Sequence, residues 1–478
     1  GARVFLLEND DNNKVFTIAF RTPPGDSTGT PHILEHSVLC GSDKYPSKDP
    51  FVELVKGSLN TFLNAMTYPD KTMYPVASCN DKDFQNLMSV YMDAVFHPNI
   101  YKNEKLFRQE GWHYELERED ADLIYNGVVY NEMKGAFSSP EEVMGRYNKQ
   151  LLFPHTPYAF ESGGDPEVIP ELSYEDFLAF HKKYYHPSNS YIYLYGDMNM
   201  EEKLIWMDRE YLGKYDAIEV DSAIPLEPAF DRMREDTIFY GITDSESEEE
   251  GAYLSWSKVA GSELDPKKYL AFQVLEYVLL NAPGAPVKKA LLDAGIGKDI
   301  FGGYDGELLQ PTFTIAAKSA KPEQKEEFAA LIQKVLREQA ENGLNKNSLL
   351  AGLNNCEFRC READYGRFPK GLMYGLQAFE SWIYDDTAPM IHLAYDETFA
   401  FLREAVNTGY FEELIREDLL SNQHGVLLTV LPKKGYLKEM EERTAKKLAE
   451  FKASLTPDQI KELVRQTKEL KEFQDTPS

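Results

Sequence analysis

Cysteine is scarce in this sequence: the 478 residues contain four, Cys40, Cys79, Cys356 and Cys360. No two of them form a CxxC pair, and so few in so long a chain cannot make a disulfide framework. We therefore expect a soluble protein of a reducing compartment, such as the bacterial cytoplasm or an organelle matrix. Cys356 and Cys360 stand one helical turn apart, and we expect them to serve packing rather than chemistry.

Long apolar runs are also missing. No stretch approaches the roughly 18 residues that a membrane span requires, so we expect no membrane partner. The chain begins Gly1-Ala2-Arg3, without an initiator methionine or a signal peptide. We expect that any targeting segment was removed or was never present.

Basic residues are few relative to acidic ones, with 51 Lys and Arg against 79 Asp and Glu and a net charge of −28. Such a surface argues against nucleic acid or an anionic membrane as the main partner and favours cationic ligands or metal ions. The alternative is that the charge only aids solubility. With 42% hydrophobic residues, the chain is expected to fold into two to four domains of roughly 100–200 residues each.

Strands and helices are interspersed along the chain without a strict βαβ rhythm. Segments 15–20 and 191–195 are β-rich and apolar on both sides, as buried strands are. Thr30 and Pro31 predict the N-cap and first turn of a helix that runs to about Cys40. Further helices are predicted near 51–63, 83–96, 103–117 and 125–137. The sequence therefore predicts an α+β fold, with helices flanking a mixed sheet.

The second half of the chain echoes the first. The heptad at 33–39 has a counterpart at 274–280, and a strand and then a helix follow each heptad at matching spacing. Matching order and spacing indicate a duplicated module. We predict a first module over 1–225 and a second over 234–450, because helical periodicity lapses between them.

The last predicted helix opens with a Thr-Pro-Asp-Gln cap at Thr456 and runs to about Phe473. It carries an apolar stripe of Ile460, Leu463, Val464, Leu470 and Phe473. Such a stripe needs a surface to pack on. We expect that another module covers it or that the helix folds back onto the second module.

The strongest functional signal is an HILEH motif, whose histidines are His32 and His36. On a helix, residues four apart lie on one face a single turn apart, so both imidazoles can reach one ion. Glu35 flanks that face and can hold a carboxylate beside a metal-bound water. The order HxxEH is the inverse of the HExxH zinc motif. The second copy has Gln273 and Tyr277 at these positions, so only the first module is expected to bind a metal.

Zinc suits two imidazoles and one carboxylate, with the fourth position left for water. Glu132 is the best candidate for the carboxylate, because it lies mid-helix among apolar residues, where an unpaired buried carboxylate would be costly. The alternative is an exposed Glu132 that pairs with Lys134 or with nothing. Spacing also leaves open four acids near the preceding helix, namely Glu104, Glu110, Glu115 and Glu117.

The residues around the motif resemble the presequence proteases of the pitrilysin/insulinase family of inverted-motif zinc peptidases. The resemblance is carried by TGTP and GS on either side of the motif and by PFVELVKGSLNTFLNA and TYPDKT after it. It is most specific over residues 15–135 and runs through the whole chain. It implies that His32, His36 and Glu132 bind one Zn²⁺ and that Glu35 is the general base.

The resemblance also implies a substrate-binding edge. In the family, the segment matching Asn64, Ala65 and Met66 is an edge strand to which a peptide adds, and the asparagine contacts the substrate backbone near the zinc. Backbone pairing of this kind binds unstructured peptides with little regard to side chain. Without the family, Asn64 is equally well explained as a turn-forming residue ahead of Pro69-Asp70.

Members of the family have two halves, each of two modules, that close around a chamber. The resemblance implies that this chain is one half, that 456–478 begins the helical hairpin joining the halves, and that the other half supplies an arginine and a tyrosine. The expected function is a zinc-dependent endopeptidase that degrades unstructured, cationic peptides such as cleaved targeting peptides. The alternatives are a non-catalytic peptide-binding or scaffold half, and a half-length peptidase that needs the second half or a second chain.

Overall fold

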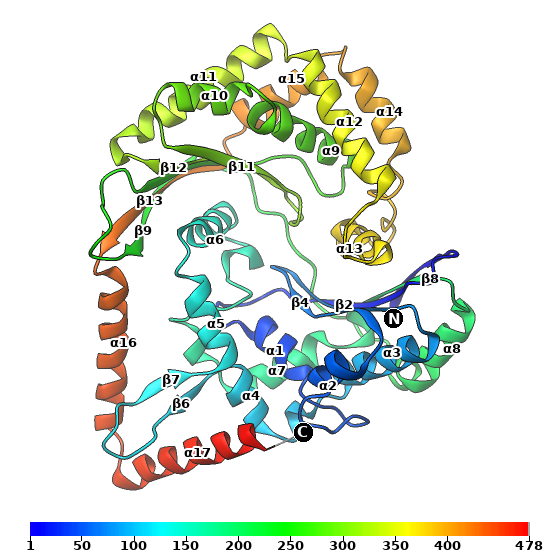
Figure 1. The fold of residues 1–478 in the computed structure, drawn as a ribbon, viewed down its shortest axis with the longest axis vertical. Helices are drawn as coiled ribbons and strands as arrows, with labels where there is room; N and C mark the ends of the chain where they lie inside the picture. The colour runs from blue at the N-terminus through cyan, green and yellow to red at the C-terminus, as the bar shows by residue number, and fades with distance from the viewer. Residues whose placement is uncertain (477–478) are drawn as a thin grey trace.

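The computed structural model describes residues 1–476 and contains two large β-sheets, each flanked by helices, and a two-stranded hairpin (Figure 1). The two sheets lie in the upper and lower parts of Figure 1, and most helices cover their outer sides. The α+β fold expected from the sequence is therefore confirmed. No helix within residues 1–476 is both long and apolar enough to cross a bilayer.

The helices come in runs between groups of strands. Those of the first half are α1 Thr30–Val38, α2 Pro50–Gly57, α3 Asp81–Phe96, α4 Glu104–Glu110, α5 Val128–Ala136, α6 Pro140–Leu152, α7 Tyr174–Tyr184 and α8 Met200–Glu210. Those of the second half are α9 Pro266–Glu276, α10 Pro286–Asp293, α11 Lys325–Asn342, α12 Lys346–Glu362, α13 Lys370–Trp382, α14 Asp396–Ala405, α15 Tyr410–Leu414, α16 Tyr436–Ala453 and α17 Pro457–Asp475.

The first sheet has the strand order β1-β8-β2-β5-β3, and the short strand β4 also pairs with β5. Its strands are β1 Arg3–Glu8, β2 Lys14–Arg21, β3 Asn60–Leu63, β4 Met66–Thr67, β5 Lys71–Ser78 and β8 Ser190–Gly196. Alternate residues of β2 face opposite sides, with Phe16 and Ile18 in the core under α1 and α3, and Val15 and Ala19 in the core under α13. Because both faces are covered, the strand is apolar throughout.

The second sheet repeats this topology. Its strands are β9 Arg234–Ile242, β10 Ala252–Val259, β11 Asp299–Asp305, β12 Thr312–Ala320 and β13 Gly425–Lys434. Their order β9-β13-β10-β12-β11 matches β1-β8-β2-β5-β3 strand for strand, with the parallel pair at the same edge. Helix α9 follows β10 as α1 follows β2, and α11 follows β12 as α3 follows β5. The duplication expected from spacing is confirmed.

Each copy also contributes a helix to the sheet of the other. Helix α6 packs against β9, β10 and β13, whereas α13 covers β2 and β8. Gly371 and Gly375 allow this close approach of α13, because a Cβ on either would lie 2.1 or 2.6 Å from a ring atom of Tyr195 or Tyr193. The two copies therefore share their cores, and the module bounds 1–225 and 234–450 remain a prediction.

The two C-terminal helices leave the second sheet and return to the first copy. Figure 1 shows α16 running down the side of the molecule and α17 along its base. The Thr456 cap forms as expected, because its hydroxyl accepts a hydrogen bond from the Gln459 amide at 3.3 Å. The stripe residues Ile460 and Leu463 pack at the hairpin of β6 His113–Glu115 and β7 Ile124–Asn126. The expectation that α17 folds onto the second module was wrong, since the hairpin offers the apolar surface.

Several predicted helix bounds were also wrong. The helix predicted near 51–63 ends at Gly57 and is followed by β3, and the helix predicted near 103–117 ends at Glu110 before β6. The helix predicted near 125–137 starts three residues late, after β7. Helix α1 has Gly29 as its N-cap, while the Thr30 hydroxyl lies 2.9 Å from that of Thr28. Strands of three or four residues, such as β3, β6 and β7, are too short for their pattern of apolar residues to distinguish them from the end of a helix.

Candidate metal centre

Helix α1 holds the two histidines of the HxxEH motif on one face. Its residues Ile33 and Leu34 are fully buried in the first core, which fixes the rotation of the helix. His32 is 8% exposed and His36 is half-buried. Their ring centroids lie 4.9 Å apart, as expected for residues one turn apart. The helix therefore presents both imidazoles toward the same point.

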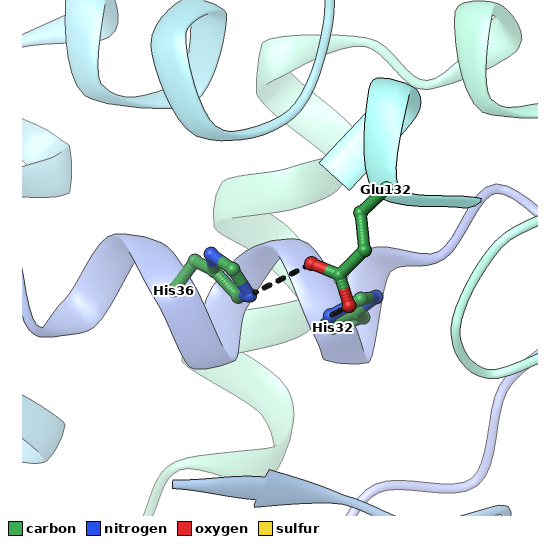
Figure 2. A group of neighbouring side chains, drawn as sticks. All are labelled: His32, His36 and Glu132. Atoms are coloured by element: carbon green, nitrogen blue, oxygen red, sulfur yellow. Dashed lines mark ion pairs between the residues drawn. The ribbon is translucent and has the colours of Figure 1, made fainter. Parts of the chain in front are cut away.

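Glu132 reaches that point from helix α5. Figure 2 shows its carboxylate between the two rings, with Oε1 3.6 Å from His32 Nε2 and Oε2 3.8 Å from His36 Nε2. Gly127 precedes α5 with a φ of 152°, and a Cβ there would lie 2.2 Å from the Gly111 carbonyl oxygen. Only glycine allows α5 to start so close to the end of α4. One ligand atom from each of the three residues lies within 4.8 Å of the others.

The second nitrogen of each histidine is held by another part of the chain. His32 Nδ1 lies 3.0 Å from the Gly163 carbonyl oxygen, and His36 Nδ1 lies 3.3 Å from Glu110 Oε2. A carbonyl and a carboxylate can only accept, so the proton of each ring is placed on Nδ1. In the neutral ring, Nε2 then carries the lone pair, and in both histidines this atom faces Glu132. This arrangement, in which a carboxylate or carbonyl orients the imidazole, is typical of metal-ligating histidines.

The charges around His36 reinforce this orientation. Burial lowers the pKa of His36, but the hydrogen bond to Glu110 and the charges of Glu35, Glu110 and Glu132 outweigh burial and raise it above 6.5. Burial raises the pKa of Glu110, but hydrogen bonds from His36 and Gln109 outweigh burial and lower it below 4.5. Glu110 is therefore ionised at neutral pH and remains a hydrogen-bond acceptor.

Glu35 lies beside the same face of α1 and has its own partner. The Thr67 hydroxyl, on β4, donates a hydrogen bond of 2.6 Å to Glu35 Oε2. One carboxylate oxygen is thus held by the edge strand, which leaves Oε1 for another contact. Sequence reasoning identified Glu35 but not the contact from Thr67, since residues 32 positions apart give no local signal. It also missed Gly163, whose contribution is a backbone carbonyl.

The structure separates Glu132 from the four acids that spacing left open. Among residues 1–476, the group of neighbouring ligand atoms contains Glu132 and none of the four. Glu110 lies on the far side of the His36 ring and orients it. The reason given for choosing Glu132 was wrong, because its side chain is 52% exposed rather than buried. Its partners are the two histidines and not Lys134.

The predicted substrate edge lies next to this cluster. Met66 pairs with Met73 on β5, while Asn64 and Ala65 lie between β3 and β4. The Asn64 carbonyl accepts a hydrogen bond of 2.9 Å from Tyr91, and its amide donates to Pro75 at 3.4 Å. Within residues 1–476, strands β3 and β4 pair with β5 and with no other strand, so their outer edge keeps unpaired backbone groups.

The donor set has a defined chemical use. Two neutral imidazole nitrogens and one carboxylate are a ligand set that suits Zn²⁺ and leaves a fourth position for water. A second carboxylate beside such a site can accept a proton from that water. The side chains present therefore fit a hydrolytic zinc site.

Three family models match the chain. The model described as "Insulinase (Peptidase family M16)" matches residues 21–139, which include His32, His36 and Glu132 and also Glu35. The model described as "Peptidase M16 inactive domain" matches residues 171–355. A third model, for a region associated with one subfamily of these peptidases, matches residues 430–478.

Similar proteins of known name match along the whole chain. The chain is 49% identical over 476 residues to "Protein HypA" of Clostridium perfringens, covering 100% of this chain and 49% of that protein. It is 42% identical over 488 residues to "Presequence protease 1, chloroplastic/mitochondrial" of Arabidopsis thaliana, covering 100% of this chain and 45% of that protein. The chain thus spans about half the length of the curated relatives it matches.

A solved structure has the same fold at low sequence identity. The peptidase M16 inactive domain from Pseudomonas fluorescens matches with a TM-score of 0.68 and 15% identity, covering 91% of this chain and 96% of that one. At this identity the likeness concerns the fold alone.

Proposed function

The chain belongs to the insulinase (M16) peptidase family, and we propose that it is the zinc-binding half of an endopeptidase that cleaves unstructured peptides. The observation that carries the proposal is the convergence of His32, His36 and Glu132 beside Glu35. The names of its relatives favour cleaved targeting peptides as substrates. The net charge of −28 favours peptides that are cationic.

In this proposal, His32 Nε2, His36 Nε2 and the Glu132 carboxylate hold one Zn²⁺. When bound, zinc supplies a Lewis acid that lowers the pKa of a bound water to about 7 and polarises the scissile carbonyl. The contacts of Gly163 and Glu110 with Nδ1 would select the tautomer whose Nε2 is available to the ion.

Glu35 is the proposed general base. Its Oε2 is held by Thr67, so Oε1 accepts the proton of the attacking water. The same oxygen then returns the proton to the leaving amine, which completes hydrolysis of the peptide bond. Thr67 fixes the orientation of the Glu35 carboxylate and so lowers the entropy cost of reaching the reactive geometry.

The edge formed by Asn64, Ala65 and Met66 is the proposed docking strand for the substrate. A peptide added there would use the backbone groups that β5 leaves free, and this mode of binding needs an extended, unfolded chain. Because Thr67 is part of β4 and contacts Glu35, a peptide on this edge would pass beside the general base.

The relatives are about twice as long as this chain. We therefore infer that the active form needs either the remainder of that length or a second chain to close the chamber and complete the site. The stripe of α17 gives no support for a second chain, since it is covered by the β6–β7 hairpin. A reducing compartment remains part of the proposal, because all four cysteines are free thiols.

A non-catalytic half is the weaker candidate. The description "inactive domain" attaches to residues 171–355, whereas His32, Glu35, His36 and Glu132 all lie within 21–139. The second copy has Gln273 at the position of His32 and so lacks a metal ligand, as expected of a non-catalytic copy.

Zinc analysis and peptide digestion test the proposal on the chain at its natural length. Glu35→Gln should keep one zinc per chain and lose about 10²–10⁴ in kcat, as expected for a general base. Glu132→Gln should lose zinc as well as activity. Glu104→Gln, an exposed change on the neighbouring helix, should change neither. Full activity in Glu35→Gln, or absence of zinc from the unmodified protein, would overturn the proposal.

A further inference from the structure

A cavity of about 330 Å³ lies between the two copies. Its walls come from the start of β5 and the turn before it, from the loop between β11 and β12, and from helices α9, α12 and α13. The three helices lie near one another in Figure 1. Residues lining it include Tyr68, Tyr269, Glu307 and Glu380. Gln273, the counterpart of His32, also lines it. Helix α9, which lacks the metal-binding histidines, thus forms one wall of the cavity, and residues of the first copy form another.

The cavity is lined by two carboxylates, Glu307 and Glu380, and by two basic side chains, Lys71 and the exposed Arg359, whose guanidinium lies 3.7 Å from Cys356 Sγ. Three further acids lie close to the two carboxylates, namely Asp70, Glu263 and Asp305, so acids outnumber bases around it. Glu380 accepts a hydrogen bond of 2.7 Å from Tyr269, and within residues 1–476 no cationic side chain forms a salt bridge with it. Glu263 is fully buried, and neither of its carboxylate oxygens has a hydrogen-bond partner in the described chain, although Oε1 lies 3.4 Å from His392 Nε2. The nearby His392 Nε2 donates to the Glu263 backbone carbonyl at 2.9 Å.

Of the two basic side chains in the described lining, Lys71 is buried and already paired. Lys71 is 3% exposed, and its Nζ lies 3.6 Å from Asp70 Oδ1. Burial, followed by the charge of Glu263, raises the pKa of Glu380 to about 8. Burial and then the charge of Asp305 raise the pKa of Glu307. Both shifts disfavour the ionised carboxylate, and a cation bound beside these side chains would favour it and lower both pKa values.

The β-strand register connects this cavity to the docking strand. Thr67 faces Glu35, and its neighbours on either side face the opposite way, because the Tyr68 hydroxyl lies 3.6 Å from Met66 Sδ. Met66 pairs directly with Met73, which lines the cavity. In an added strand, side chains alternate between the two faces. A peptide beside β4 would therefore direct every second side chain toward the cavity.

We propose that this cavity is a subsite for one lysine or arginine side chain of the peptide, with Glu380 and Glu307 as the carboxylates that receive its charge. The inference rests on the proposed function for the path of the peptide and adds a preference for a basic residue at a fixed register. It differs from attraction by the net charge of the chain, which would act at every position alike.

Binding of matched peptides tests the inference without cleavage. The background is Glu35→Gln, and the probes are fluorescent twelve-residue neutral peptides that carry one arginine or, at the same position, citrulline. The arginine is moved along the peptide one position at a time at 150 mM salt. We expect arginine to bind about tenfold more tightly than citrulline at alternate positions only. In Glu380→Gln and in Glu307→Gln, the ratio should fall to about two or less.

The control is Glu326→Gln, which removes an exposed charge from α11 and should leave the ratio unchanged. Near-ultraviolet circular dichroism checks folding, and Glu307→Gln decides the question if Glu380→Gln does not fold. An arginine advantage that is equal at all positions, is absent, or survives in both variants would overturn the inference. Parallel digestion with Glu35 intact separates the two proposals. Cleavage without a preference for arginine would refute the proposed subsite but not the peptidase function. A preference for arginine in binding without any cleavage would refute the peptidase function but not the subsite.

Discussion

Replacement of Glu110 by glutamine tests whether the contact behind His36 holds the metal centre together. Glu110 Oε2 is 3.3 Å from His36 Nδ1, while Oε1 accepts a hydrogen bond of 2.7 Å from Gln109. A glutamine has one acceptor oxygen and one donor nitrogen. His36 and Gln109 both donate to the carboxylate of Glu110. In either orientation of the glutamine side chain, one of these two donors would face an amide N–H instead of an acceptor.

The expected effect is on zinc affinity more than on folding. Loss of a partner that orients a metal-ligating histidine costs about 10- to 100-fold in affinity, or about 1.4–2.8 kcal/mol. The lower end applies if the amide oxygen turns to His36 and retains a neutral hydrogen bond. The upper end applies if the ring rotates and its Nε2 no longer points at Glu132.

Competition with a chromophoric chelator measures the zinc dissociation constant for the unmodified chain, Glu110→Gln and Glu132→Gln. The loss in Glu110→Gln should be clear but smaller than that in Glu132→Gln, which removes a ligand. Glu104→Gln, on the same helix, is the matched control and should bind zinc normally. A dissociation constant for Glu110→Gln within twofold of the unmodified chain would refute the reasoning that the buried carboxylate orients His36.

Two further predictions concern stability. Burial lowers the pKa of His181 to about 4, so between pH 6.5 and 4 the unfolded chain binds a proton that the folded chain does not. This histidine should therefore lower the free energy of unfolding by about 2 kcal/mol on going from pH 7 to pH 5. In His181→Gln, the free energy of unfolding measured with urea should fall by about 2 kcal/mol less between pH 7 and pH 5 than in the unmodified chain. An equal fall in the two proteins would contradict the assignment. Gly371→Ala places a Cβ 2.1 Å from the Tyr195 ring and should cost about 1–3 kcal/mol. Gly145→Ala, with no atom within 4 Å, should be neutral or stabilising, and equal melting temperatures for the two variants would show that α13 does not need its glycine.

Local patterns in the sequence were sufficient for several features of this fold. The buried strand β2 could be predicted because it is apolar on both faces, and α17 could be predicted from its Thr456 cap and its apolar stripe. The HxxEH spacing placed His32 and His36 on one helical face, where the structure has them. The duplicated order of elements was visible because both copies kept their spacing.

Other features could not be predicted in this way, because their partners are distant in the chain. Strand β3 was interpreted as the end of a helix, since its four residues become a strand only by pairing with β5. Glu132 was chosen partly for a burial that it does not have, and its position depends on where Gly127 lets α5 begin. The surface that covers α17 belongs to a hairpin more than 300 residues earlier.

The sequence by itself determined which chemical groups are available and how the ones close together in the chain are spaced on a helix. Helical periodicity is a local property, so an imidazole pair four residues apart needs no knowledge of the rest of the molecule. The tertiary structure alone decided which carboxylate approaches that pair, which one supports it from behind, and which ones are left without a cation between the two copies. Those outcomes depend on how sheets and helices pack, and packing is set by contacts between residues that the order of the chain does not bring together.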